Sequence, residues 1–321
     1  MRLFANAHYH VIESRKKAYI FSATMIAIGL TGIVVNIVTT GSWLNYGVDF
    51  TGGSLVQVRF TGPSVDAADV RSALGGAEAP PITRFGEENE FVIRAPLTEG
   101  ASINEIAAQI QTELSKAFDP GSFEIVRQEL VGAKVGGELQ RKAALAVLFS
   151  MVVTLVYLAI RFEFTFGLAA TLATAHDILI TLGFMAVMRL SWDLPSVAAI
   201  LTVVGYSLND TIIVFDRIRE NLHKKGARKR DRTELINESI NETLPRTILT
   251  VSTVLATLVA LLLFGGAVIR DFTMVLILGV VFGTYSSIFV ASPALMEIQK
   301  RWEARDAEKE RKKSRPEPAT V

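Results

Sequence analysis

Cysteine is missing from the sequence altogether. Its absence excludes disulfide bonds, zinc–thiolate sites and thiol nucleophiles. The sequence also has no glycine-rich loop between a strand and a helix, no cluster of metal-ligand side chains, and no nucleophile beside a base. We therefore expect a protein without a cofactor or metal, which is not an enzyme and does not bind nucleic acid.

Long stretches without charge are abundant instead. Half of the 321 residues are hydrophobic, and apolar runs of about 18 residues or more are long enough to cross a bilayer. The third run is interrupted by His176 and Asp177, and the fourth by Asp210. We predict six membrane-spanning helices, at residues 18–38, 143–160, 164–188, 194–215, 246–269 and 272–296.

Lysine and arginine are distributed unevenly around the predicted spans. Three of them, Arg15 to Lys17, precede the first span, and residues 217–232 hold eight basic residues against two acidic ones. Basic loops stay in the cytoplasm, so both chain ends are predicted to lie there. The basic loop is interpreted as a topology signal, with attraction to anionic lipid or docking on a cytoplasmic partner as alternatives. The predicted cytoplasmic segments are residues 1–17, 216–245 and 297–321.

One long hydrophilic segment, residues 39–142, separates the first two spans and is predicted to be extracytoplasmic. Alternating and helical patterns in it suggest the order β-α-β-β-α-β, which is typical of a ferredoxin-like α+β domain. The fold class is therefore an α-helical polytopic membrane protein with one extracytoplasmic ferredoxin-like domain. The predicted elements are residues 54–60, 64–76, 81–85, 90–96, 101–118 and 123–129.

Two glycine-containing segments join this domain to the spans. In GVDFTGG (47–53), Gly52 and Gly53 are expected to take positive φ in a tight turn while Asp49 caps nearby amides. A role for Asp49 near a proton exit is the alternative. In GAKVGGE (132–138), Gly136 and Gly137 are expected to act with the first pair as hinges.

Ionisable residues inside the spans indicate function, because each costs roughly 2.5 to 3.5 kcal/mol at the bilayer centre. Asp210 and Arg246 are expected at similar depth in antiparallel neighbouring spans, as a proton-coupling pair. Static helix packing is the alternative interpretation. We expect further polar residues to complete a seam between these spans: Tyr206, Ser207, Asn209, Thr250, Thr253 and Thr257.

His176 and Asp177 in the third span form another candidate proton-coupling site. Neighbouring residues on a helix point about 100° apart, so the sequence leaves open which of them faces the seam. A structural role for both is equally compatible with the pattern. Protonation of Asp210 would remove the counter-charge of Arg246, so the seam is predicted to switch between two states.

Four motifs resemble those of the SecF family. SecF is the smaller member of the bacterial SecD–SecF pair in the resistance–nodulation–division superfamily. The likeness runs from the first span to the last. The motifs are GVDFTGG, HDILITLGF (176–184), GYSLNDTIIVFDRIREN (205–221) and PRTILTVSTVLATLVALLLFGG (245–266).

The resemblance implies a function and partners. SecF-like proteins pair with SecD, associate with the SecYEG channel and with SecA and YajC, and lie in the bacterial inner membrane as multi-pass proteins. They use the proton-motive force to complete preprotein translocation after the SecA step. The family's intramembrane carboxylate and arginine match Asp210 and Arg246, and its acidic residue in the glycine motif matches Asp49.

Two other functions remain as alternatives. The chain is compatible with a half-transporter of the same superfamily that exports lipid or small molecules, although such proteins normally carry both halves in one longer chain. It is also compatible with a static scaffold subunit whose buried charges only fix helix packing.

Overall fold

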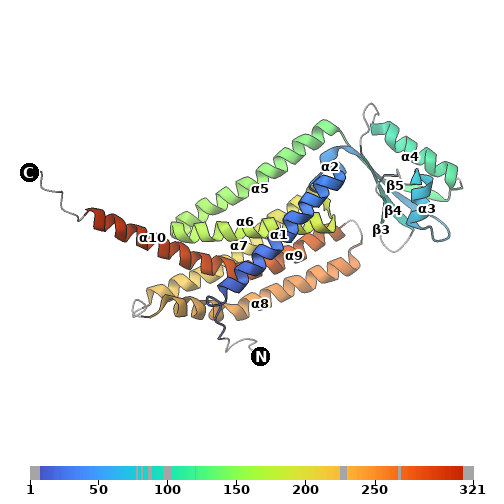
Figure 1. Cartoon of the computed structure of the whole chain (residues 1–321). Coiled ribbons are helices and arrows are strands. Elements are labelled where there is room, and N and C mark those ends of the chain that lie inside the picture. Colours follow the sequence, from blue (N-terminus) through green and yellow to red (C-terminus); the bar gives the residue numbers. More distant parts are fainter. Residues whose placement is uncertain are drawn as a thin grey trace, which may run out of the picture.

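The computed structural model describes residues 8–76, 79–80, 82–85, 89–96, 103–119, 121–224, 230–266 and 269–313. A bundle of long helices makes up most of the structure. A small domain of strands and helices lies at one end of the bundle, opposite the start of the first helix and the end of the last (Figure 1).

Six helical stretches are long and apolar enough to cross a membrane, which confirms the predicted number. The last stretch is continuous, because a π-helical turn, η3 (Ser287–Ala291), joins α9 to α10. The protein is therefore a multi-pass membrane protein; the orientation stays a prediction. The helices are α1 (Arg15–Thr40), α5 (Ala133–Arg161), α6 (Phe164–Met188), α7 (Leu194–His223), α8 (Arg232–Phe264), α9 (Arg270–Ser286) and α10 (Ser292–Lys313).

Four helices extend well beyond their predicted bounds. Helix α5 begins ten residues before position 143, α7 continues to His223, α8 begins at Arg232 and runs through Pro245, and α10 continues to Lys313. The predicted bounds followed the change from apolar to charged residues. A helix does not have to end where its apolar run ends, because its backbone hydrogen bonds are internal. The segment predicted as a long basic loop is thus largely helical.

The small domain has a four-stranded antiparallel sheet in the order β3-β4-β2-β5. This is the split β-α-β arrangement predicted from the element order. Alternating side chains of β2 and β4, among them Val56, Val58 and Ile93, are fully buried with Leu114 of α4. The elements are β2 (Gly53–Phe60), α3 (Ala67–Ala73), β3 (Ile82–Phe85), β4 (Glu90–Pro96), α4 (Ile103–Ala117) and β5 (Phe123–Val131).

A short junction holds the small domain against the bundle. Strand β1 (Asn45–Tyr46) pairs in parallel with β6 (Ser191–Trp192), which immediately precedes α7. The one-turn helix α2 (Val48–Thr51) packs against the first turns of α5. The junction therefore connects the domain directly to the start of α7.

Burial divides the spans into an inner and an outer group. More than half of the membrane window is buried in α6, α7 and α9, against 11 to 17% in α1, α5 and α8. Because burial is concentrated in α6, α7 and α9, these inner helices carry most of the polar residues inside the bundle.

Small residues permit α1 and α6 to approach closely. A Cβ on Gly29 of α1 would lie 2.6 Å from the Cα of Gly183 in α6.

Candidate functional site

Asp210 lies on the buried side of α7, where it faces α8. The residue is 6% exposed, and its Oδ1 accepts a hydrogen bond of 2.8 Å from the hydroxyl of Thr247. Its Oδ2 is buried, and no hydrogen-bond donor in the described part of the chain reaches it. The carboxyl group is therefore only half satisfied in a place where water is scarce.

Arg246 forms no direct ion pair or hydrogen bond with Asp210 within the described residues, although it lies near enough to act on Asp210 electrostatically. Its side chain is exposed, and within the described ranges it has no ion pair of 4.0 Å or less. Adjacent residues on a helix point about 100° apart, so Thr247 and Arg246 do not share one direction, and it is Thr247 that faces α7. The spacing of Thr247, Val251 and Leu258 at i, i+4 and i+11 is the sequence pattern that marks the inward face of α8. All three residues are buried.

The threonines predicted to share the seam also point away from α7. Thr250, Thr253 and Thr257 are exposed, and each hydroxyl donates to a carbonyl of its own helix at 2.8 to 3.1 Å. Such local bonds satisfy a hydroxyl without a neighbouring helix. Together with Arg246 these residues form a polar stripe on the outer face of α8, which we call the outer stripe.

The residues predicted around Asp210 on α7 do not share one direction either. Asn209 is exposed and Tyr206 is partly buried. Ser207 is 1% exposed and donates to Asp177 on α6. The predicted single seam is therefore wrong, because successive residues of α7 face different neighbours.

His176 and Asp177 belong to a second buried cluster, which joins four helices. The Oδ2 atom of Asp177 accepts hydrogen bonds from Ser207 of α7 at 2.6 Å and Ser286 of α9 at 2.7 Å. Its Oδ1 lies 2.9 Å from Nδ1 of His176. The Nε2 atom of His176 lies 2.9 Å from the hydroxyl of Ser22 in α1. We call these five residues the Asp177 cluster.

Two members of the Asp177 cluster, Ser22 and Ser286, were missed in the sequence analysis. Both are single hydroxyls within apolar runs, a pattern too common in spans to single them out. Ser286 directly precedes the π-helical turn, and such turns occur frequently at functional sites. Ser287 in that turn lies 2.8 Å from the hydroxyl of Thr211, which follows Asp210 on α7.

Asp49 lies at the N-terminus of α7, whereas Asp210 lies near the middle of that helix. Its Oδ2 accepts a hydrogen bond of 3.0 Å from the backbone amide of Leu194, the first residue of α7. Sixteen residues separate Leu194 from Asp210, or about 24 Å along a helix. The structure therefore agrees with the capping interpretation of Asp49 and does not bring it to the other charged residues.

The neighbouring Asp193 is the N-cap of α7 and accepts from both the amide and the hydroxyl of Ser196. Burial raises the pKa of Asp193 above its usual range, and the nearby Asp49 carboxylate raises it further, against the lowering by the Ser196 hydrogen bonds. Two carboxylates thus meet at the junction between the small domain and α7.

The four predicted hinge glycines have different environments. Gly52 and Gly53 have φ of 73° and 141°, which confirms the expected positive φ. Gly136 and Gly137 lie inside α5 and not in a loop, so they are not hinges of the predicted kind. A Cβ on Gly136 would lie 2.7 Å from the carbonyl oxygen of Phe50, and this glycine therefore permits the contact between α5 and α2.

Within the described residues, no group of three or more His, Cys, Asp or Glu side chains is placed to hold a metal ion. What the site offers is one half-satisfied carboxyl group on α7 and one satisfied cluster to which α7 contributes Ser207. The first can take up a proton on a free oxygen, and the second ties α7 to three other helices.

Two family models match this chain. One describes the C-terminal part of the protein export membrane protein SecD/SecF and covers residues 110–301, and the other describes the SecD/SecF GG motif and covers residues 37–64. Similar proteins include the protein translocase subunit SecF of Gemmatimonas aurantiaca, 45% identical over 94% of this chain and 90% of that protein. The SecF subunit of Desulfurispirillum indicum is 43% identical over 98% of both.

A similar solved structure is SecDF from Thermus thermophilus, described as a translocon-associated membrane protein. It is 35% identical, with a TM-score of 0.77 over 92% of this chain. A SecDF structure in a super-membrane-facing form is 34% identical, with a TM-score of 0.68 over 95% of this chain. The chain spans about two-fifths of the length of these SecDF proteins, 39% and 40% respectively.

Proposed function

The chain belongs to the SecF family of protein translocase subunits, and from this membership we propose that it works with SecD to complete protein translocation with the energy of the proton-motive force. It does so in the bacterial inner membrane, after the SecA step, at the SecYEG channel and with YajC as a further partner. It is an accessory component of translocation with no catalysis of its own.

The free oxygen of Asp210 carries this proposal. A buried carboxylate with one unsatisfied oxygen is costly, and a proton on Oδ2 removes its charge without breaking the bond from Thr247. Moving one charge through the membrane potential is worth about 2.3 kcal/mol per 100 mV. That is enough to bias two helix arrangements that differ by a few kcal/mol.

Helix α7 is the element that connects the proton to the small domain. Asp210 lies near the middle of α7, and the first residue of the helix receives the cap from Asp49 in the glycine motif. Backbone pairing of Asn45 and Tyr46 with the strand before α7 adds to the connection. We propose that movement of α7 on protonation shifts this junction and with it the domain that acts on the preprotein.

The outer stripe of α8 is proposed as the face that meets SecD. A guanidinium on the outside of a span is unfavourable against lipid. A partner helix that covers Arg246 would supply it with polar contacts at the depth of Asp210. His176 and Asp177 are assigned to holding the inner helices together, because their polar atoms are already bonded.

Replacement of Asp210 by Asn tests the proposal, because it keeps the shape and removes the titratable proton. In vesicles that contain SecD and the channel, we expect preprotein release driven by a proton gradient to fall to the level without a gradient. Asp216→Asn is the matched control, since Asp216 is an exposed acid on the same helix and its replacement should leave release unchanged.

Co-purification with SecD separates the remaining outcomes of this test. A variant that loses release but keeps SecD supports proton coupling. If release by Asp210→Asn equals that of the unmodified protein, the chain is a scaffold subunit and the proposed coupling is wrong.

A further inference from the structure

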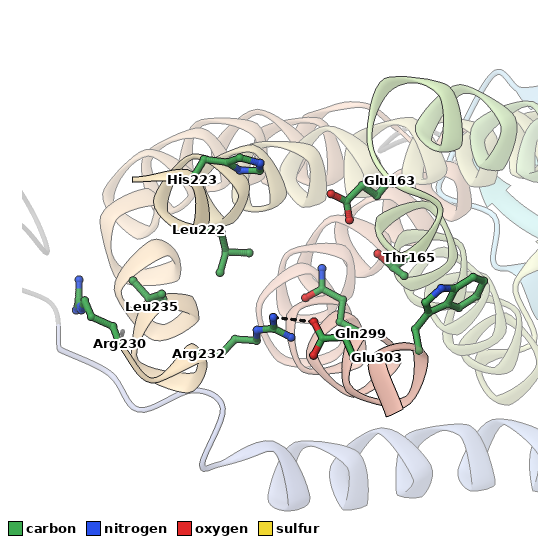
Figure 2. A pocket seen from close by; sticks show the side chains of 10 residues that line it. Glu163, Thr165, Leu222, His223, Arg230, Arg232, Leu235, Gln299 and Glu303 are labelled. Carbon is green, nitrogen blue, oxygen red and sulfur yellow. Dashed lines mark hydrogen bonds and ion pairs between the residues drawn. The ribbon is translucent and has the colours of Figure 1, made fainter. Parts of the chain in front are cut away.

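A cavity of about 440 Å³ lies at the end of the bundle that holds the start of α8. Its walls come from the turn between α5 and α6, the end of α7, the start of α8, and α10. Figure 2 shows side chains from these segments around one open space, among them Thr165, His223, Arg232 and Gln299. None of its residues belongs to the Asp210 site or the Asp177 cluster, so the proposed function does not use it.

Two buried polar atoms at this cavity have no partner. Thr165 is 8% exposed, and within the described ranges its hydroxyl makes no hydrogen bond. The side-chain oxygen of Gln299 is buried and equally without a partner there. Figure 2 shows both side chains directed toward the cavity. Buried polar groups are normally hydrogen-bonded, so these two indicate a polar ligand.

The start of α6 makes the same wall suited to an anion. Its N-cap residue, Glu163, makes no side-chain capping bond, and Thr165 stands in the first turn. The first amides of a helix attract negative charge, phosphate groups in particular. Arg232 lines the same space, and a guanidinium forms strong bonds to phosphate.

Carboxylates in the lining restrict the ligand further. Glu303 is paired with Arg232 at 2.8 Å, whereas the exposed carboxylate of Glu163 has no ion pair among the described residues. The cavity is thus lined by two arginines, Arg230 and Arg232, and by these two acids. A purely anionic ligand would be repelled by the acids, so the balance favours a zwitterion.

The position of the cavity relates it to the bilayer surface. It lies where α5 leaves its predicted span and α6 enters its own, between the parts of α7 and α8 that extend beyond their predicted spans. The rings of Phe164 and Trp302 lie 5.8 Å apart and are 50% and 44% exposed. Exposed aromatic side chains at the ends of spans are typical of the headgroup region.

We propose that this cavity binds the headgroup of a zwitterionic phospholipid with a primary ammonium group, that is, phosphoethanolamine. The phosphate lies at the start of α6, where the hydroxyl of Thr165 and the guanidinium of Arg232 bind it. The ammonium faces Glu163, Glu303 and the free side-chain oxygen of Gln299. A primary ammonium donates hydrogen bonds to these carboxylates and a quaternary choline does not, which distinguishes the two common zwitterionic headgroups.

Native mass spectrometry of the full chain in detergent tests this proposal. The probes are phosphatidylethanolamine, phosphatidylcholine and phosphatidylglycerol with identical acyl chains, and inorganic phosphate. We expect the ethanolamine lipid to be retained in preference to the others. Thr165→Val should weaken its retention about tenfold, as expected for a lost hydrogen bond to a charged group. Thr174→Val is the matched control, because that hydroxyl is buried on the same helix and bonds only its own backbone.

A second variant tests the ammonium end separately. Glu163→Gln should retain binding of phospholipids but lose the preference for ethanolamine over choline, with no change in thermal stability because the carboxylate makes no bond to any other described residue. The proposal is overturned if Thr165→Val retains the ethanolamine lipid as well as Thr174→Val does. It is also overturned if the three lipids bind alike, or if inorganic phosphate displaces the lipid at equal concentration.

Discussion

Two aspartates buried in the same bundle differ in how well they are bonded. Asp177 is 1% exposed, and one of its oxygens alone accepts from Ser207 and Ser286. Asp210 is 6% exposed and accepts only from Thr247, with its second oxygen free of any donor among the described residues. Burial is therefore nearly equal, while hydrogen bonding is not.

This difference separates a packing role from a switching role. A proton added to the satisfied carboxylate of Asp177 has no free oxygen to occupy and would disrupt bonds to two other helices. A proton added to Asp210 occupies a free oxygen and removes a buried charge. Intramembrane charge alone thus indicates a functional region, and the bonding of each oxygen indicates which residue changes state.

The largest expected effect is a loss of stability when Asp177 is replaced, and it tests the difference in bonding between the two aspartates. Asp177→Ala removes three hydrogen bonds, those with His176, Ser207 and Ser286, and at roughly 0.6 kcal/mol for each hydrogen bond within a membrane we expect a loss of about 2 kcal/mol. Asp210→Ala removes one bond and a buried charge, so its loss should stay below about 1 kcal/mol. Denaturant unfolding in mixed micelles measures both. Equal losses would contradict the distinction.

The next effect concerns the single bond to Asp210. Thr247→Val keeps the shape of the side chain and removes the donor, so we expect proton-driven release to fall several-fold while the free energy of unfolding changes by only about 0.6 kcal/mol. Thr243→Val serves as the control, because that hydroxyl lies one turn earlier on α8 and bonds only its own helix. Unchanged release in Thr247→Val would remove Thr247 from the site.

A smaller effect is expected at the N-terminus of α7, where the N-cap residue Asp193 titrates. Because burial raises its pKa, the folded protein binds this proton more tightly than the unfolded chain. The free energy of unfolding should therefore fall as the pH rises from about 4, the ordinary value for Asp, through the raised pKa. Asp193→Asn retains a good N-cap and removes this dependence.

Unfolding of the two proteins at about pH 4 and about pH 8 measures this effect. The unmodified protein should lose more stability between these values than Asp193→Asn does. An identical loss in both would show that Asp193 does not contribute to the pH dependence of the junction.

The smallest effect is expected on the outer stripe. Thr253→Val should weaken association with SecD about threefold, corresponding to roughly 0.6 kcal/mol, with the stability of the isolated chain unchanged. Thr31→Val is the control, because Thr31 is an exposed threonine on α1 that bonds its own backbone in the same way. Titration of the two variants with SecD in nanodiscs measures the difference, and equal affinities would move the SecD contact away from α8.

Local patterns in the sequence were sufficient for much of the fold. The six spans follow from the lengths of the apolar runs, and the sheet order of the small domain follows from the order of its elements. The positive φ of Gly52 and Gly53 follows from the need for a tight turn. Each of these depends on residues close together in the chain, where hydropathy, strand alternation and backbone sterics act.

Tertiary structure alone decided how each helix is rotated about its axis. That rotation gives Thr247, and not Arg246, to Asp210, and it brings Ser22 and Ser286 from distant helices to the Asp177 cluster. A rotation of about 100° exchanges one residue for its neighbour, and hydropathy barely distinguishes the two settings on a helix that is apolar all round. The packing of small residues between helices selects the rotation, and it depends on all the helices together.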